Sequence, residues 1–340
     1  MIKTAVTEMF GVKYPIICGS MMWLCRPELC AAVSEGGGLG NLTCGNYETE
    51  DELKSAISRV RELTGKPFML GVTLMPSVRV TPEMNRMYLR VAAEEKVAGM
   101  EISGMPLDMA FGKEALTALK HAGVRVFHKV GCLKHGIHAQ KAGYDGVYCL
   151  GFEAGGHPYK DNVGTIVLTP RMVDALDIPV VTVGGIADGR AMAAALALGA
   201  QGIMMASRFL TTRECPVHDN IKQELIKRNE ADTVIFGGKG LGMQGRALKN
   251  GLVEKIQNIE DGGGGLEELF PLISGERIKN AWEKGLVDDA PFMVGQCIGH
   301  IHEIMTCKEV LETVCRDAQK HLSRANTLFQ KDQQGTSAEP

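Results

Sequence analysis

His157 is the side chain in this sequence best suited to acid–base chemistry, and it lies in the segment Gly-Phe-Glu-Ala-Gly-Gly-His-Pro at positions 151–158. Histidine has an unperturbed pKa close to neutrality. Gly155 and Gly156 permit backbone angles that other residues avoid and let a ligand approach the main chain, while Pro158 stiffens the chain that follows. A Gly-rich turn with a solvent-exposed histidine would show the same pattern, so this motif alone leaves both interpretations open.

Two turns of small residues later in the chain could hold an anion. They are Gly-Gly-Ile-Ala-Asp-Gly at 184–189 and Met-Ala-Ser-Arg at 205–208, and each follows a short apolar run. Small residues at the start of a helix leave backbone N–H groups free to face an anion. Two such turns in neighbouring positions favour a phosphate, and flavin mononucleotide (FMN) is a natural occupant.

Lys129 lies next to the end of the apolar run at 124–130. Met21 and Met22 follow an earlier apolar run, at 15–18. The lysine could stabilise negative charge on the N1–C2 edge of a reduced flavin or bind a ribityl or phosphate oxygen. A rim lysine paired with a carboxylate is the equally weighted alternative. The methionines could form an adaptable apolar floor for a flat ring, or simply fill the core. Glu153 is expected to be a local salt-bridge or helix-start residue.

Composition narrows the class of protein. The chain has 340 residues, is 45% hydrophobic and 23% charged, and carries a net charge of −3. This charge gives no electrostatic case for nucleic acid or a membrane surface. No apolar run approaches the roughly 20 residues of a membrane helix, and no signal-peptide pattern is present at the N-terminus. The ten cysteines form no C-x-x-C pair, so we expect free thiols in a reducing cytoplasm and no metal site.

Short apolar runs alternate with helical patterns through the first two thirds of the chain. The expected strands are 15–18, 39–43, 67–73, 100–103, 124–130, 146–150, 179–183 and 202–205. Eight β-then-α units predict a closed (β/α)8 TIM barrel over residues 10–235, with an open doubly wound sheet as the alternative. Thr169 and Pro170 are expected to begin the helix that follows the His157 segment. Residues 236–330 are expected to form a helical cap on the barrel without a core of its own, and 331–340 a polar tail.

At this point the sequence resembles a known family. The resemblance rests on five motifs: Pro-Ile-Ile-Cys-Gly-Ser-Met at 15–21, Gly-Gly-Gly-Leu-Gly at 36–40, Glu-Ala-Gly-Gly-His at 153–157, Val-Gly-Gly-Ile at 183–186 and Ala-Ser-Arg-Phe-Leu at 206–210. In this order they resemble the nitronate monooxygenase (2-nitropropane dioxygenase) family of FMN-dependent TIM barrels, over about residues 10–300. That family also includes flavin-dependent enoyl-thioester reductases and quinone reductases.

The resemblance implies a catalytic acid or base, His157, and an FMN site. The implied cofactor-binding residues are Gly19, Ser20, Met21, Met22, Thr73, Lys129, Gly155, Gly156, Gly184, Gly185, Met204, Met205, Ala206 and Ser207. The family often has Asn where this chain has Thr73. It usually has Gln-Met-Gly-Thr where this chain has the residues 204–207.

The first functional hypothesis is a nitronate monooxygenase type of enzyme, in which a substrate carbanion or nitronate reduces FMN and oxygen re-oxidises it. The second is an NAD(P)H-dependent enoyl-thioester (acyl-CoA or acyl carrier protein) reductase or a quinone reductase. The Gly-Gly-Lys-Gly segment at 237–240 and Arg246 could then meet a coenzyme A or nicotinamide phosphate. The third is a barrel that binds a phosphorylated ligand without redox chemistry. The expected partner is a small-molecule substrate. The sequence leaves open whether the chain forms a homodimer.

Overall fold

Eight parallel strands form the centre of the molecule. The computed structural model describes residues 2–77 and 79–329, so the polar tail expected at 331–340 lies outside the described residues. The strands are β1 (Ile16–Cys18), β2 (Gly40–Thr43), β3 (Phe68–Leu74), β4 (Gly99–Gly104), β5 (Arg125–Val130), β6 (Gly146–Leu150), β7 (Val180–Val183) and β8 (Gly202–Met205). Each pairs in parallel with its neighbours in the order β1-β8-β7-β6-β5-β4-β3-β2. A parallel bridge from Ile17 to Leu39 joins β1 to β2. The predicted (β/α)8 TIM barrel is confirmed.

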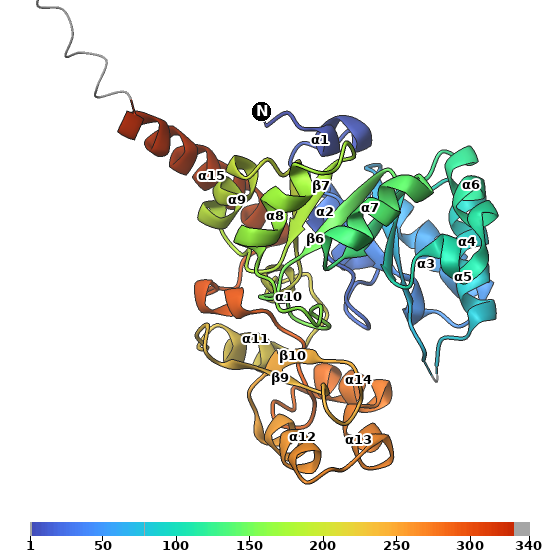
Figure 1. Cartoon of the computed structure of the whole chain (residues 1–340), viewed down its shortest axis with the longest axis vertical. Helices are drawn as coiled ribbons and strands as arrows, with labels where there is room; N and C mark the ends of the chain where they lie inside the picture. The colour runs from blue at the N-terminus through green and yellow to red at the C-terminus, as the bar shows by residue number, and fades with distance from the viewer. Residues whose placement is uncertain (1, 78, 330–340) are drawn as a thin grey trace, which may run out of the picture.

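Helices surround this barrel on the outside (Figure 1). They are α2 (Pro27–Glu35), α3 (Glu50–Leu63), α4 (Pro82–Glu94), α5 (Leu107–Phe111), α6 (Lys113–His121), α7 (Leu133–Ala142), α8 (Thr165–Val173) and α9 (Gly189–Ala197). Because successive side chains of a strand point to opposite faces, one set fills the barrel and the other packs under the helices. The inward set forms one buried cluster with side chains from α1 (Ala5–Phe10), which lies at the N-terminal end of the strands. The barrel is therefore a packed core that is plugged at one end.

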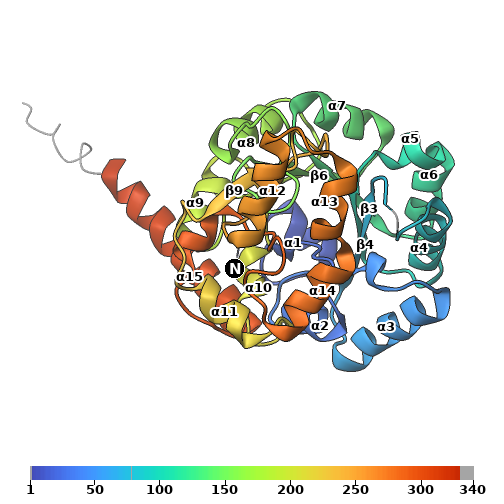
Figure 2. The same ribbon diagram turned by 90° about the horizontal axis from the view of Figure 1, so that it is seen from below.

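The cap lies at the opposite end from α1 (Figure 1) and crosses the barrel opening when viewed along the axis (Figure 2). Its elements are α11 (Asp219–Leu225), β9 (Thr233–Phe236), β10 (Gly245–Leu248), α12 (Gly251–Asp261), α13 (Leu266–Ile273), α14 (Gly275–Lys284) and the 3-10 helix η2 (Gln296–His300). The strands β9 and β10 pair antiparallel. A small buried cluster lies between them and α12 and α13, contrary to the expectation of a cap without its own core; its members are Phe236, Ala247, Leu252, Val253, Ile256 and Leu269.

The long helix α15 (Cys307–Phe329) packs on the barrel helices α9 and α2. It therefore occupies the place of the helix that should follow β8, where only the short α10 (Ser207–Leu210) is found. The chain leaves the barrel and returns to it at one point, because Thr212 forms a parallel bridge with Met305. The cap is thus an insertion between β8 and the last helix of the ring.

Trp23 connects the loop after β1 to the cap. Its backbone φ is +69°, in the left-handed region that a bulky residue rarely adopts. The guanidinium of Arg79 lies 4.3 Å from the centre of its ring, and the ammonium of Lys279 in α14 lies 5.2 Å away. Two cation–π contacts therefore join the β1 loop, the loop after β3 and the cap.

The helix after the His157 segment begins earlier than the sequence indicates. It starts at Thr165, so Thr169 and Pro170 lie inside α8 and do not begin it. Its first N–H group is satisfied from outside the helix, because the carboxylate of Glu153 accepts hydrogen bonds from Thr165 N (3.0 and 3.1 Å) and from its hydroxyl (2.8 Å). The expectation that Glu153 is a helix-start residue is confirmed, because its carboxylate takes the place of the capping side chain that Gly164 lacks.

Candidate active site

The carboxyl ends of the parallel strands bring distant segments to one rim of the barrel, the rim that faces the cap. The loops after β1, β6, β7 and β8 all meet there, and β3 and β5 each contribute a side chain near their ends, Thr73 and Lys129. Thr73 is exposed although its strand is otherwise buried. The residues assigned to cofactor binding from the sequence therefore come from six different segments of the same rim.

A buried carboxylate, Glu101 in β4, lies beneath this rim and is 0% exposed. Its Oε1 is 2.5 Å from the Lys129 ammonium and accepts a hydrogen bond from Ser103 Oγ at 3.1 Å. Its Oε2 accepts hydrogen bonds from Asn41 Nδ2 at 2.6 Å and from the backbone N–H of Ser20 at 3.3 Å. One side chain thereby joins β2, β4, β5 and the loop after β1. Lys129 is therefore a rim lysine paired with a carboxylate, and Glu101 orients its ammonium group.

Glu101 and Asn41 were not identified from the sequence. The available signal was a charged residue in the middle of the apolar run that forms β4, because a carboxylate is almost never fully buried without a partner. Asn41 adds a further feature, since its Oδ1 is buried without a hydrogen-bond partner among the described residues. The rim therefore holds one unsatisfied acceptor next to a saturated carboxylate.

His157 projects from the loop after β6, and its side chain is exposed to solvent. The surrounding protein nevertheless desolvates the imidazole, and this lowers its pKa below the ordinary value of 6.5. The positive charge of Lys129 lowers the pKa of His157 further. Both effects disfavour the imidazolium, so the ring is neutral near pH 7 and can accept a proton.

The turn after β7 has the backbone shape that its glycines suggest. Gly184 has a φ of +106° and Gly185 a φ of +71°. A Cβ on Gly184 would lie 3.0 Å from the carbonyl oxygen of Gly151 and 3.1 Å from Ala154 N. This turn therefore packs against the beginning of the His157 loop, and only glycine fits there without displacing it.

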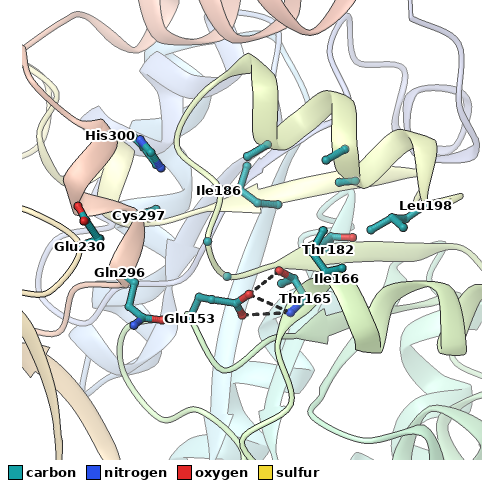
Figure 3. A pocket seen from close by; sticks show the side chains of 15 residues that line it. Glu153, Thr165, Ile166, Thr182, Ile186, Leu198, Glu230, Gln296, Cys297 and His300 are labelled. Atoms are coloured by element: carbon teal, nitrogen blue, oxygen red, sulfur yellow. Dashed lines mark hydrogen bonds between the residues drawn. The ribbon is translucent and has the colours of Figure 1, made fainter. Parts of the chain in front are cut away.

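A cavity of about 410 Å³ adjoins this turn on its outer side, between α8 and α9. Figure 3 shows Ile186, Ile166, Thr182 and Leu198 along one side of it and Gln296, Cys297, Glu230 and His300 on the other. Because Thr182 points outward from β7, this cavity lies beside the barrel and not over its opening.

The segment after β8 is in contact with both the barrel and the cap. Met205 is buried in the layer between strands and helices, and its carbonyl accepts a hydrogen bond from Gly19 N at 2.9 Å. Met204 points into the barrel. Ser207 Oγ accepts a hydrogen bond from Gly295 N, in the cap, at 3.0 Å. The segment predicted to bind a phosphate is therefore hydrogen-bonded to the loop after β1 on one side and to the cap on the other.

The Gly-Gly-Lys-Gly segment of the cap, expected to meet a phosphate, already holds an anion from the same chain. The carboxylate of Glu260 accepts hydrogen bonds from Gly237 N (2.8 Å), Lys239 N (3.1 Å) and Gly240 N (2.8 Å). The Lys239 ammonium lies 2.7 Å from Asp261. These contacts account for the shape of the segment by internal structure, and the phosphate contact expected there stays a prediction.

Comparison with known proteins places these features in a family. The family model for nitronate monooxygenase matches residues 3–317. The chain belongs to the nitronate monooxygenase family. The sequence resemblance is thus confirmed, the chain is a flavin-dependent oxidoreductase, and the non-enzymatic alternative is not supported.

Three relatives illustrate the range of this family. The chain is 32% identical to "(3aS,4S,5R,7aS)-5-hydroxy-7a-methyl-1-oxo-octahydro-1H-indene-4-carboxyl-CoA dehydrogenase" of Rhodococcus jostii (strain RHA1), covering 96% of this chain and 99% of the relative. It is 30% identical to a "Probable nitronate monooxygenase" of Staphylococcus aureus (strain Newman), covering 76% of this chain and 81% of the relative. The solved structure of FabK from Thermotoga maritima matches with a TM-score of 0.87 at 32% identity, over 97% of this chain and 100% of FabK.

All ten cysteines are free in the structure. Among the described residues, no helix combines the length and the apolar character needed to cross a membrane.

Proposed function

We propose that the protein is an FMN-dependent oxidoreductase that acts on an acyl thioester, with a nicotinamide dinucleotide as its redox partner. The observation that carries this proposal is the match to a named CoA-thioester dehydrogenase over 96% of this chain, cap included. The named nitronate monooxygenases cover 76% of the chain. In both groups a substrate is oxidised or reduced next to a flavin, so the rim residues must bind the cofactor and move a proton.

The rim residues fit FMN on three observations. The left-handed turn at Gly184 and Gly185 would place small residues next to a phosphate, whereas the first N–H groups of α9 are already bonded to the Asp188 carboxylate. Asn41 Oδ1 is a buried acceptor without a partner among the described residues. A Cβ on Gly156 would meet nothing within 4 Å, so the chain next to His157 borders open space.

In this proposal the cofactor-binding residues predicted from the sequence keep their roles. The segment 19–22 and the pair Gly155–Gly156 would lie against the flavin ring, and the segments at 184–185 and 204–207 would surround its phosphate. Bound FMN supplies a reversible two-electron acceptor. Lys129, oriented by Glu101, stabilises negative charge that develops next to it.

His157 carries the proton in either direction of the reaction. As a neutral base it would accept the α-proton of a saturated acyl thioester, while the β-hydrogen leaves as hydride to the acceptor that bound FMN supplies and an enoyl thioester forms. In the reverse direction the protonated ring returns that proton to the substrate. A lowered pKa favours the accepting role near neutral pH.

Oxidation of a nitronate or nitroalkane is the second candidate. A neutral imidazole beside a fixed cation also suits removal of a proton next to a nitro group, since the resulting negative charge would face Lys129. The names of the staphylococcal relatives point in this direction.

Anaerobic stopped-flow measurement of flavin absorbance separates the two candidates. We expect NADH or NADPH to bleach the yellow protein and crotonyl-CoA to restore its colour. Bleaching by propyl-2-nitronate but by neither nicotinamide would reject the thioester proposal in favour of the second. In either case His157→Ala should retain FMN and lose about 10²–10⁴ in turnover, the range of a positioned acid or base.

A further inference from the structure

The loop that carries His157 is joined to the cap strand β10 by its backbone. The N–H of Arg246 donates to the carbonyl oxygen of Gly156 at 2.6 Å, and the N–H of Gly156 donates to the carbonyl oxygen of Arg246 at 3.1 Å. These two bonds form an antiparallel bridge immediately before His157. Gly156 has a φ of +83°, so the bridge fixes a backbone turn that directs the next residue.

Gln244, two residues earlier in the cap, holds the chain on the other side of His157. Its Nε2 donates to the carbonyl oxygens of Tyr159 (2.9 Å) and Pro158 (3.3 Å) and to Oδ1 of Asn162 (2.9 Å). Asn162 itself has a φ of +54°. One cap side chain therefore reaches three acceptors within five residues of His157.

The side chain of Arg246 completes the attachment. Its Nη2 and Nε donate to the carbonyl oxygen of Phe152 at 3.1 and 3.3 Å, and its Nη1 donates to Thr233 Oγ1 at 3.0 Å. The guanidinium also lies 4.6 Å from the centre of the Phe152 ring. Arg246 is 3% exposed and is committed to the loop, which explains its burial without any phosphate.

The barrel contacts this loop at its two ends and at Tyr159, whose ring lies 5.3 Å from the ring of His135 in α7. Glu153 binds Thr165 at the start of α8, whereas the stretch from Gly156 to Asn162 has its side-chain hydrogen bonds with the cap. Because hydrogen bonds on both sides of His157 run to the cap, the position of the imidazole depends on where β10 lies as well as on the barrel contact of Tyr159.

We propose that Gln244 and Arg246 are positioning residues for His157, so that the cap strand β10 is part of the proton-transfer apparatus. The inference rests on the proposed role of His157 as the proton carrier. A displacement of β10 would therefore move the imidazole relative to the rim.

A double-mutant cycle tests this inference on the flavin-loaded protein. The variants are Gln244→Ala, His157→Ala and the pair, with Gln257→Ala as the matched control. Gln257 also lies in the cap and also donates from Nε2 to a backbone carbonyl, that of Ile235 (3.1 Å), but among the described residues it forms no hydrogen bond with the His157 loop. The readouts are turnover with the substrate found by stopped flow, FMN affinity, and hydrogen–deuterium exchange of peptides covering 151–164.

We expect Gln244→Ala to lower kcat by about 10–100-fold, the cost of a misplaced group of about 1 Å, with FMN affinity unchanged. Exchange at 151–164 should rise, and Gln257→Ala should change none of these. In the His157→Ala background the same Gln244 substitution should cost less than about twofold, because two residues that act through one group are not additive.

Two results would overturn the inference alone: full turnover in Gln244→Ala, or an equal loss with and without His157. Full turnover in His157→Ala would instead remove the proposed role of His157 and this inference with it. Arg246→Lys gives a second variant, since lysine retains the charge but cannot reproduce the paired bonds to Phe152. It should show the same pattern, with its melting temperature recorded alongside.

Discussion

Replacing Glu101 by Gln is the sharpest test of the buried network under the rim. Each carboxylate oxygen faces two donors, and on each side one of them cannot reverse: Lys129 at Oε1 and the backbone N–H of Ser20 at Oε2. Whichever way the new amide lies, its NH2 group is placed against a fixed donor. The substitution also removes the negative partner of a lysine that is only 19% exposed.

The size of the effect follows from this geometry. Removing one partner of a buried ion pair costs about 3–5 kcal/mol. An unfolding entropy of about 2.1 cal/mol/K per residue gives roughly 0.7 kcal/mol/K for a chain of 340 residues. Glu101→Gln should therefore lower the melting temperature by about 4–7 °C. Lys129→Met leaves the fully buried carboxylate with three donors but no positive charge, so it should also cost about 3–5 kcal/mol.

Circular dichroism melting of FMN-free protein measures both variants without a contribution from ligand binding. In the double variant the amide NH2 can turn toward the vacated lysine position, so the combined loss should be smaller than the sum of the two. A Glu101→Gln protein that melts within about 1 °C of the wild type would refute the reasoning, as would strict additivity of the two substitutions.

The pH dependence of turnover should show an acid limb from His157 below its ordinary pKa of 6.5, because only the neutral ring accepts a proton and its pKa is lowered in the fold. Lys129→Met removes a positive charge and should move that limb to higher pH in a profile of kcat/KM. Gly184→Ala should weaken FMN binding and destabilise the fold by about 1–3 kcal/mol, because its Cβ would press on the carbonyl of Gly151; fluorescence titration with FMN and thermal melting check this. Trp23→Leu should lower stability by about 1–3 kcal/mol and speed proteolysis within the cap, because it removes both cation–π contacts of that ring; an unchanged digestion rate would contradict the assigned link.

The barrel could be predicted because its signals are local. Each strand is a short apolar run bounded by Gly or Pro, and strict alternation with helices leaves few topologies. The position of the site at the rim could be predicted for the same reason, since parallel strands place all their carboxyl ends at one edge. His157 and the glycine turns were found in this way, and their roles toward FMN stay predictions.

The features that were missed depend on partners far away in the chain. The start of α8 at Thr165 depends on a carboxylate from Glu153 and not on a neighbouring cap residue. Glu101 acquires its role only when β4 pairs with β5 and brings Lys129 beside it. Arg246 looks like a phosphate ligand from its charge, whereas its donors are used by a loop 94 positions earlier.

The return of the chain at Thr212 and Met305 has a consequence for biosynthesis. The ribosome completes all eight strands early, but α15, which fills the gap between α9 and α2, is made only after the entire cap. Until then the apolar flank of the barrel between these two helices stays uncovered. A nascent chain paused within the cap would therefore expose that flank, and chaperone binding should be greatest in this interval and should end once α15 is released.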